Sequence, residues 1–145
     1  MSSLTSHWAF WALLAALAAA LTAIFAKIGL QGVDSDFATL LRTAMVLVLL
    51  AIIVLATGKW SNPLALSAHT WLFLALSALG TGASWLFYFR ALKMGEAFQV
   101  APVDKLSVVL VALLAVAFLG ERPAPRDWLG IALVTGGVAL LAWRR

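Results

Sequence analysis

Five long apolar segments dominate this chain and limit what it can fold into. They cover residues 10–30, 37–56, 71–89, 98–119 and 128–143. A helix needs about 20 apolar residues to cross the roughly 30 Å hydrocarbon layer of a bilayer. The last segment is shorter, but Trp143, Arg144 and Arg145 can anchor its end at the membrane surface. The pattern predicts an all-α integral membrane protein with five transmembrane helices.

Composition supports the same class. Hydrophobic residues make up 64% of the 145 residues and charged residues only 11%, whereas a soluble domain is about half apolar and a quarter charged. The length allows one membrane domain over residues 1–145. The net charge of +4 comes from basic residues scattered singly, so no nucleic-acid partner is expected. The first apolar segment is too long for a cleavable signal, so we expect it to be a retained helix.

The connections between the segments are short and contain turn residues, including Gly32, Gly58, Gly95 and Gly120. Neighbouring helices are therefore expected to be antiparallel. One membrane side, called side X, would hold the loops around Asp34 and Lys93 and the C-terminus. Four cations flank side X (Arg90, Lys93, Arg144, Arg145) and three flank the other (Lys59, Arg122, Arg126). This bias favours side X as cytoplasmic and leaves insertion in both orientations open.

Ionisable residues inside spanning helices are costly and mark functional sites by default. Here they are Lys27, Arg42, Arg90, Asp104 and Lys105. Following the chain up and down, all five lie in the half of the bilayer nearest side X. Trp85 and Tyr88 lie just beneath them on the third segment, so we expect a polar vestibule.

Each of these residues also has a structural interpretation. Lys27 and Arg90 are close to helix ends and can reach the headgroups instead of a substrate. Arg42 lies further from its helix end, near Thr39 and Thr43, which favours a satisfied interior role. Trp85 is either ordinary bundle packing or a residue on which a substrate stacks.

Asp104 is the sharpest case, because its short side chain cannot reach far. It either forms an ion pair with Lys27, Arg42 or Lys105, or it couples transport to protons or contacts substrate. Adjacent helix positions point about 100° apart, so Asp104 and Lys105 need not satisfy each other. Pro102 either lies in the first helical turn or removes a helical hydrogen bond, and irregular backbone at membrane depth must line a cavity or be buried in protein. The candidate substrate or coupling residues are Lys27, Arg42, Trp85, Tyr88, Arg90, Asp104, Lys105 and Ser107.

Two further features concern the helix ends and faces. Glu121 is expected to form an ion pair with its neighbour Arg122 at the membrane surface. Small residues recur at helical spacing in three segments, which allows close helix contact within the bundle or in a dimer. They are Ala12, Ala16 and Ala20 in the first segment, Gly80 and Ser84 in the third, and Ala132 and Gly136 in the last.

Enzyme chemistry is the weakest interpretation. The chain has no cysteine, and His7 and His69 lie outside the spans without companions at ligand spacing. No phosphate-binding glycine loop or Ser/His/Asp arrangement is present in the sequence. We therefore expect no catalytic residue, metal or cofactor.

Several motifs resemble one known family. Residues 85–95 read WLFYFRALKMG, residues 100–107 read VAPVDKLS and residues 118–122 read FLGER. These are followed by DWLGIALVTGGVALLAW, and residues 25–43 read FAKIGLQGVDSDFATLLRT. The combination resembles the EamA-type domain of the drug/metabolite transporter superfamily, in particular its bacterial single-domain members of five helices. The resemblance covers nearly the whole chain.

The resemblance implies secondary transport, often export, of small metabolites, amino acids or drugs across the bacterial cytoplasmic membrane. Many relatives carry two such five-helix units in inverted orientation, whereas this chain carries one. We therefore expect an antiparallel dimer, built from itself or from a paired homologue. Excess positive charge near the vestibule favours an anionic or zwitterionic small molecule. The alternative is a membrane assembly subunit that transports nothing.

Overall fold

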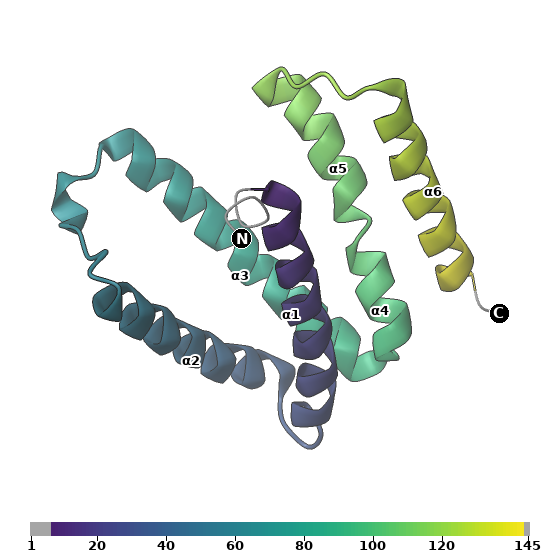
Figure 1. Cartoon of the computed structure of the whole chain (residues 1–145). Coiled ribbons are helices and arrows are strands. Elements are labelled where there is room, and N and C mark those ends of the chain that lie inside the picture. Colours follow the sequence, from purple (N-terminus) through teal and green to yellow (C-terminus); the bar gives the residue numbers. More distant parts are fainter. Residues whose placement is uncertain (1–6, 144–145) are drawn as a thin grey trace. The chain divides into compact units, whose positions relative to one another are not determined.

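The computed structural model describes residues 7–143, so Arg144 and Arg145, counted above on side X, lie outside the described residues. Within this range the chain is helical and contains no strand. The elements are α1 (Trp8–Gly29), α2 (Ser35–Ala56), η1 (Pro63–Ala65), α3 (Ala68–Met94), α4 (Ala97–Asp104), α5 (Ser107–Leu114), η2 (Ala115–Leu119) and α6 (Pro125–Ala142), as Figure 1 shows.

Four segments are long and apolar enough to cross a membrane: α1, α2, α3 and the stretch Ala97–Leu119 that contains α4, α5 and η2. The fifth candidate, α6, has 18 residues and begins with the charged residues Arg126 and Asp127. Large apolar side chains cover the outside of these helices; Leu79 is 71% exposed and Leu133 68%. Such a surface is suited to lipid, in which apolar side chains face outward without cost.

Local capping explains where several helices begin. The Asp34 side chain accepts hydrogen bonds from the backbone N–H groups of Asp36 (2.9 Å) and Phe37 (3.0 Å), so α2 begins at Ser35. The Ser67 hydroxyl accepts from Thr70 N (3.1 Å), and α3 accordingly starts three residues before the apolar segment at 71. Apolar length alone therefore underestimates α3, which runs on through charged residues to Met94.

The segment expected as one helix over 98–119 is a single spanning segment, Ala97–Leu119, in which regular α-helix is interrupted twice. α4 ends at Asp104 and α5 starts at Ser107; between them, Lys105 N and Leu106 N bond to carbonyls three residues back, both at 3.0 Å. Pro102 lies inside α4 and has no N–H to donate, so one helical hydrogen bond is also missing just before these three-residue turns.

The second interruption is η2, a wide π-helical turn. It ends at Gly120, whose φ of 68° lies in the left-handed region. Beyond it, Glu121 N donates back to Ala115 O at 3.2 Å. A residue with a Cβ is strained in this conformation, so Gly120 fixes the exit from the spanning segment.

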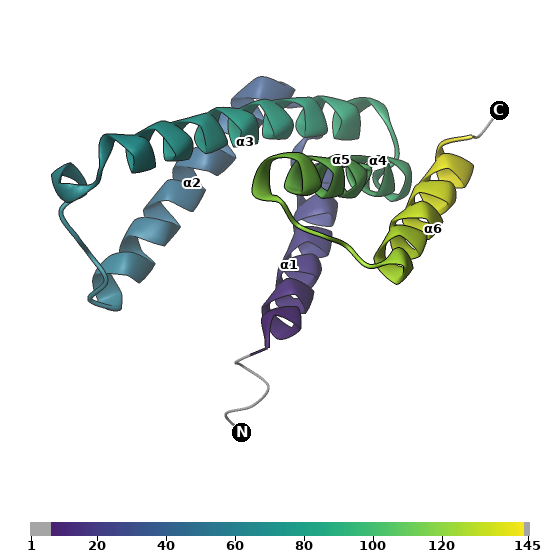
Figure 2. The ribbon, with the colours of Figure 1, turned by 90° about the horizontal axis from the view of Figure 1, so that it is seen from above.

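The chain forms two compact units, one ending at Met94 and the other beginning at Gly95. In the first unit, α3 packs against both α1 and α2, and the side chain of Leu92 is fully buried. In the second, α4 and α5 follow one another and α6 packs along them (Figure 2). Two expectations from the sequence stay predictions: that residues 1–145 form one domain, and that neighbouring helices are antiparallel.

We predict that Gly120→Ala lowers the free energy of unfolding by about 1 to 2 kcal/mol, because alanine is strained at positive φ. The matched control is Gly130→Ala in α6, where a Cβ would meet nothing within 4 Å. That change should leave stability the same or raise it by up to about 1 kcal/mol, since alanine is the better helix former. Thermal unfolding of both variants in one detergent provides the measurement. Equal stability of the Gly120→Ala and parent proteins would contradict the requirement for a left-handed turn.

Candidate functional site

The end of α3 is tied to the start of α2 by a two-point ion pair. The Arg90 guanidinium donates from Nε to Oδ1 of Asp36 at 2.8 Å and from Nη2 to Oδ2 of the same carboxylate. Asp36 is the second residue of α2, directly after the Asp34 cap, so its carboxylate lies where α3 arrives. A bidentate arginine–carboxylate pair fixes geometry as well as charge.

Two lysines add contacts at the same place. Lys93 Nζ donates to Val33 O in the α1–α2 loop at 2.8 Å, and Lys27 Nζ donates to Leu92 O at 2.8 Å. We call Lys27, Arg90 and Lys93, with their three acceptors, the basic clamp. Lys27 and Arg90, predicted either to reach the headgroups or to serve a substrate, thus bond to protein groups in the first unit.

Arg42 lies deeper along α2, about 10 Å from its first residue at 1.5 Å per residue. Its guanidinium carbon is 4.3 Å from the centroid of the Trp85 ring and 5.4 Å from that of Phe89. Trp85 and Phe89 are four residues apart on α3 and therefore share one helix face. We call these three residues the Arg42 cluster. The sequence interpretation missed Phe89, although its spacing from Trp85 was the available signal.

The Arg42 cluster leaves one charged atom without a partner. Within residues 7–143, Nη1 of Arg42 is buried and has no hydrogen-bond acceptor. The neighbouring hydroxyls bond to their own helix: Thr39 donates to Ser35 O and Thr43 to Thr39 O, both at 2.7 Å. Tyr88, also predicted for the site, contacts Phe89 with ring centroids 6.5 Å apart.

Asp104 and Lys105 flank the break between α4 and α5. Lys105 Nζ lies 3.1 Å from Asp104 Oδ2, with side chains 57% and 36% exposed respectively. Neighbouring residues on a continuous helix would point apart, as expected above, but Lys105 lies in the turn after α4 and its side chain returns to Asp104. Ser107 follows as the first residue of α5.

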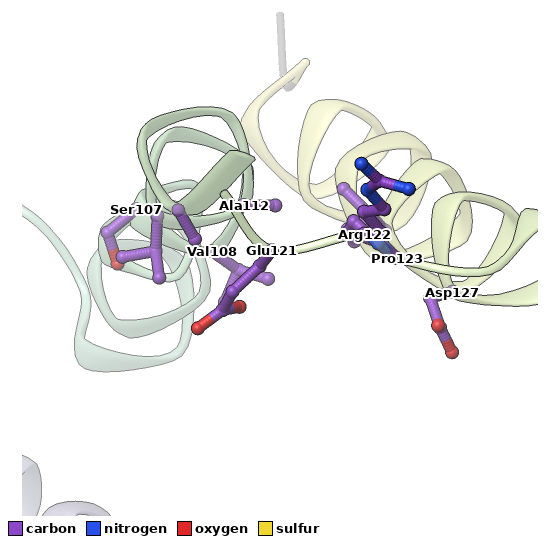
Figure 3. Close-up of a pocket in the computed structure, with 10 residues that line it drawn as sticks. Ser107, Val108, Ala112, Glu121, Arg122, Pro123 and Asp127 are labelled. Carbon is purple, nitrogen blue, oxygen red and sulfur yellow. The ribbon is translucent and has the colours of Figure 1, made fainter. Parts of the chain in front are cut away.

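An open pocket of about 490 Å³ lies between α5 and α6. Its apolar wall consists of Val108, Val111, Ala112, Ala115, Pro123 and Ile131, and its polar lining of Ser107, Glu121, Arg122 and Asp127. Figure 3 shows the Glu121 carboxylate and the Arg122 guanidinium pointing to opposite sides.

The expected ion pair between Glu121 and Arg122 is therefore wrong for the described residues. These residues follow Gly120 in a non-helical stretch, where successive side chains point in opposite directions. The nearby Asp127 caps the start of α6, because its Oδ2 accepts a hydrogen bond from Ala124 N at 2.7 Å.

The structure thus brings together some of the predicted site residues. Arg42 meets Trp85, and Asp104 meets Lys105, while Lys27 and Arg90 belong to the basic clamp. A vestibule that joins the first unit to Asp104, Lys105 and Ser107 stays a prediction. No group of three or more metal-ligating side chains occurs within residues 7–143.

Comparison with known proteins gives consistent matches. The EamA-like transporter family matches residues 6–143. A Sinorhizobium protein named "uncharacterized transporter in cobO 3'region" is 57% identical over 139 residues, which cover 96% of this chain and 99% of that protein.

More distant relatives carry a more specific name. Proteins named "probable 4-amino-4-deoxy-L-arabinose-phosphoundecaprenol flippase subunit ArnE" match from several bacteria, among them Pseudomonas fluorescens and Yersinia pestis. The Pseudomonas fluorescens protein is 37% identical over 59% of this chain and 73% of its own length. The Yersinia pestis protein is 34% identical over 61% of this chain and 78% of its own length. No solved structure matches this chain.

We predict that Asp36 and Arg90 stabilise the first unit as a coupled pair. Asp36→Asn and Arg90→Gln should each lower the melting temperature, and the double variant should fall by less than the sum, because each single change already removes the pair. Arg126→Gln is the control and should leave the melting temperature nearly unchanged. The Arg126 side chain is 90% exposed, and its Nε is 3.7 Å from the Asp127 carboxylate, so it forms only a weak surface ion pair. Additive effects in the double-mutant cycle would contradict the coupling.

Proposed function

Because the chain belongs to the EamA-like transporter family, we propose that it is a secondary transporter that moves small metabolites or drugs across the bacterial cytoplasmic membrane, with export as the expected direction. It is a multi-pass membrane protein of a transporter family. The substrate, the direction, the coupling and the paired working form belong to the proposal.

The break at Lys105 and Leu106 is the observation that carries it. It lies inside Ala97–Leu119, a segment long and apolar enough to span the membrane. The backbone N–H groups of Lys105 and Leu106 still bond to carbonyls three residues back, so the break is a tightened helical turn. A mid-helix stretch of this kind often marks a functional hinge, and transporters place substrate and coupling-ion sites where a spanning helix is discontinuous. The Asp104 carboxylate at the end of α4 supports a role in proton coupling at this break.

The proposed working form is an antiparallel dimer of five-helix units. A single copy of a unit that relatives use in inverted pairs supports it, and so does the small bias of cations between the two sides. The relatives named as flippase subunits support the use of a partner chain, either a second copy or a homologue. Ala132 and Gly136 on α6 offer a surface for close helix contact.

A second candidate function is movement of a lipid-linked substrate, because the names of the ArnE relatives state such an activity for those proteins. A third, a membrane assembly subunit without transport, gains less support. Such a subunit has no need of charged residues such as Arg42 and Asp104 in its spanning segments.

We predict that Asp104→Asn folds and inserts but loses pH-driven transport at least tenfold, because a proton-coupling residue needs its charge more than its shape. Transport would be screened in proteoliposomes over a panel of labelled metabolites and drugs, with and without a pH gradient. Glu96→Gln, an exposed carboxylate outside the spanning segments, is the matched control and should transport normally.

The same variant distinguishes a structural role. If Asp104 only pairs with Lys105, whose side chain is 57% exposed, its neutralisation should cost about 1 kcal/mol or less of stability and leave pH-driven transport unchanged. Normal pH-driven transport by a well-folded Asp104→Asn protein would refute the coupling role.

We further predict that the chain is dimeric in bilayers and that α6 contributes to the contact. Single-molecule photobleaching after reconstitution at decreasing protein density should show two copies per particle. Gly136→Leu, which adds bulk to the contact face, should shift particles to one copy, while Leu133→Val on an exposed α6 position should not. Full transport by particles that contain one copy would refute the paired working form.

A further inference from the structure

We propose that Arg42 binds an oxyanion, a phosphate or carboxylate, on the molecule that this protein transports. The inference rests on the proposed transport function and names the chemical class of the substrate. It starts from one atom, Nη1 of Arg42, which is buried and has no acceptor within residues 7–143.

Arg42 is half-buried as a residue, and the buried part of its guanidinium, Nη1, is the part without an acceptor among the described residues. Arginine stays charged at every physiological pH, so it cannot escape burial by losing a proton. Charged residues within spanning segments pair with one another, with backbone carbonyls or with a ligand. The nearby hydroxyls of Thr39 and Thr43 bond to their own helix.

The first unit offers Arg42 no free carboxylate. Its sequence holds two acidic residues, Asp34 and Asp36. Asp34 caps α2, and Asp36 is engaged in the two-point pair with Arg90. Both lie at the first turn of α2, about 10 Å of helix away from Arg42.

The other membrane-level cations of this unit have protein partners. Lys27 donates to Leu92 O, Lys93 to Val33 O and Arg90 to Asp36. Arg42 instead lies over an aromatic ring, 4.3 Å from the Trp85 centroid. The basic clamp is therefore used for structure, whereas the charge of Arg42 is available to a ligand.

The shape of the cluster suits an oxyanion. A guanidinium held over an aromatic ring keeps its N–H edge for paired hydrogen bonds to two oxygen atoms of a phosphate or carboxylate. The rings of Trp85 and Phe89 lie 4.3 and 5.4 Å from the guanidinium carbon and lower the local dielectric on that side, which strengthens the attraction to an anion. A cationic substrate would be repelled here.

Binding can be measured with the full-length protein in nanodiscs of phosphatidylcholine, which carry no net charge. The probes are inorganic phosphate, dodecyl phosphate and, as the cationic comparison, dodecyltrimethylammonium; tryptophan fluorescence gives the dissociation constant. Arg42→Gln should weaken binding of both phosphates at least tenfold, about 1.4 kcal/mol. Arg42→Lys should retain part of the affinity. Lys59→Gln removes the same charge from an exposed loop position and should bind as the parent does.

The two anionic probes separate the sources of the oxyanion. Dodecyl phosphate binding at least tenfold tighter than phosphate, in an Arg42-dependent manner, identifies a lipid-linked anion, and equal affinities identify a soluble one; both uphold the inference. Phosphate affinity that is unchanged in Arg42→Gln, or tighter binding of the cation than of either phosphate, would overturn it. So would failure of both phosphates to bind the parent protein.

A carboxylate of the second unit is the competing partner, and Asp104 is the one within a spanning segment. If Asp104→Asn lowers the melting temperature of the parent but not that of Arg42→Gln, the two residues pair with each other and the inference fails. Undiminished transport of a neutral solute by Arg42→Gln would refute this inference and leave the transport proposal intact. Arg42-dependent anion binding without any transport would uphold this inference and refute the transport proposal.

Discussion

The interior of a bilayer contains no water to satisfy a polar group, and the helices of this chain are arranged around that constraint. The amine groups of Lys27 and Lys93 donate to backbone carbonyls, and Arg90 donates to a carboxylate. Hydroxyls such as that of Thr39 return to their own helix. The residues that depart from this pattern are therefore informative: the partly unsatisfied Arg42, and the backbone break beside Asp104.

The positions of most helices could be predicted, because the thickness of the hydrocarbon layer sets how many apolar residues a spanning helix needs. The four spanning segments lie where the apolar runs lie, and the Asp34 cap falls at a turn the sequence had marked. Family membership was also readable, since the motifs around Trp85 and Asp104 are contiguous in the chain.

The partners of the charged residues could not be predicted in the same way. Arg90 and Asp36 are 54 residues apart, and only the packing of α3 on α2 brings them together. The break after Asp104 depends on a choice between bonds to the third and fourth carbonyl back, which apolar periodicity does not record. The expected ion pair between Glu121 and Arg122 was wrong because adjacency in the chain was taken for proximity of the two charged groups, which point to opposite sides.

The basic clamp has a mechanical consequence for α2 and α3. The clamp holds these helices together at one end, where α2 begins and α3 ends. The loop around η1 joins their other ends and is held by local hydrogen bonds, such as the one from Trp71 Nε1 to Pro63 O. A 22-residue helix such as α2 is roughly 33 Å long. The two helices are therefore fixed to each other at the Asp36–Arg90 ion pair, far from η1. A rotation of α2 about Asp36 and Arg90 would displace its far end, next to η1, by more than Arg42, which lies about 10 Å along α2 from the first residue.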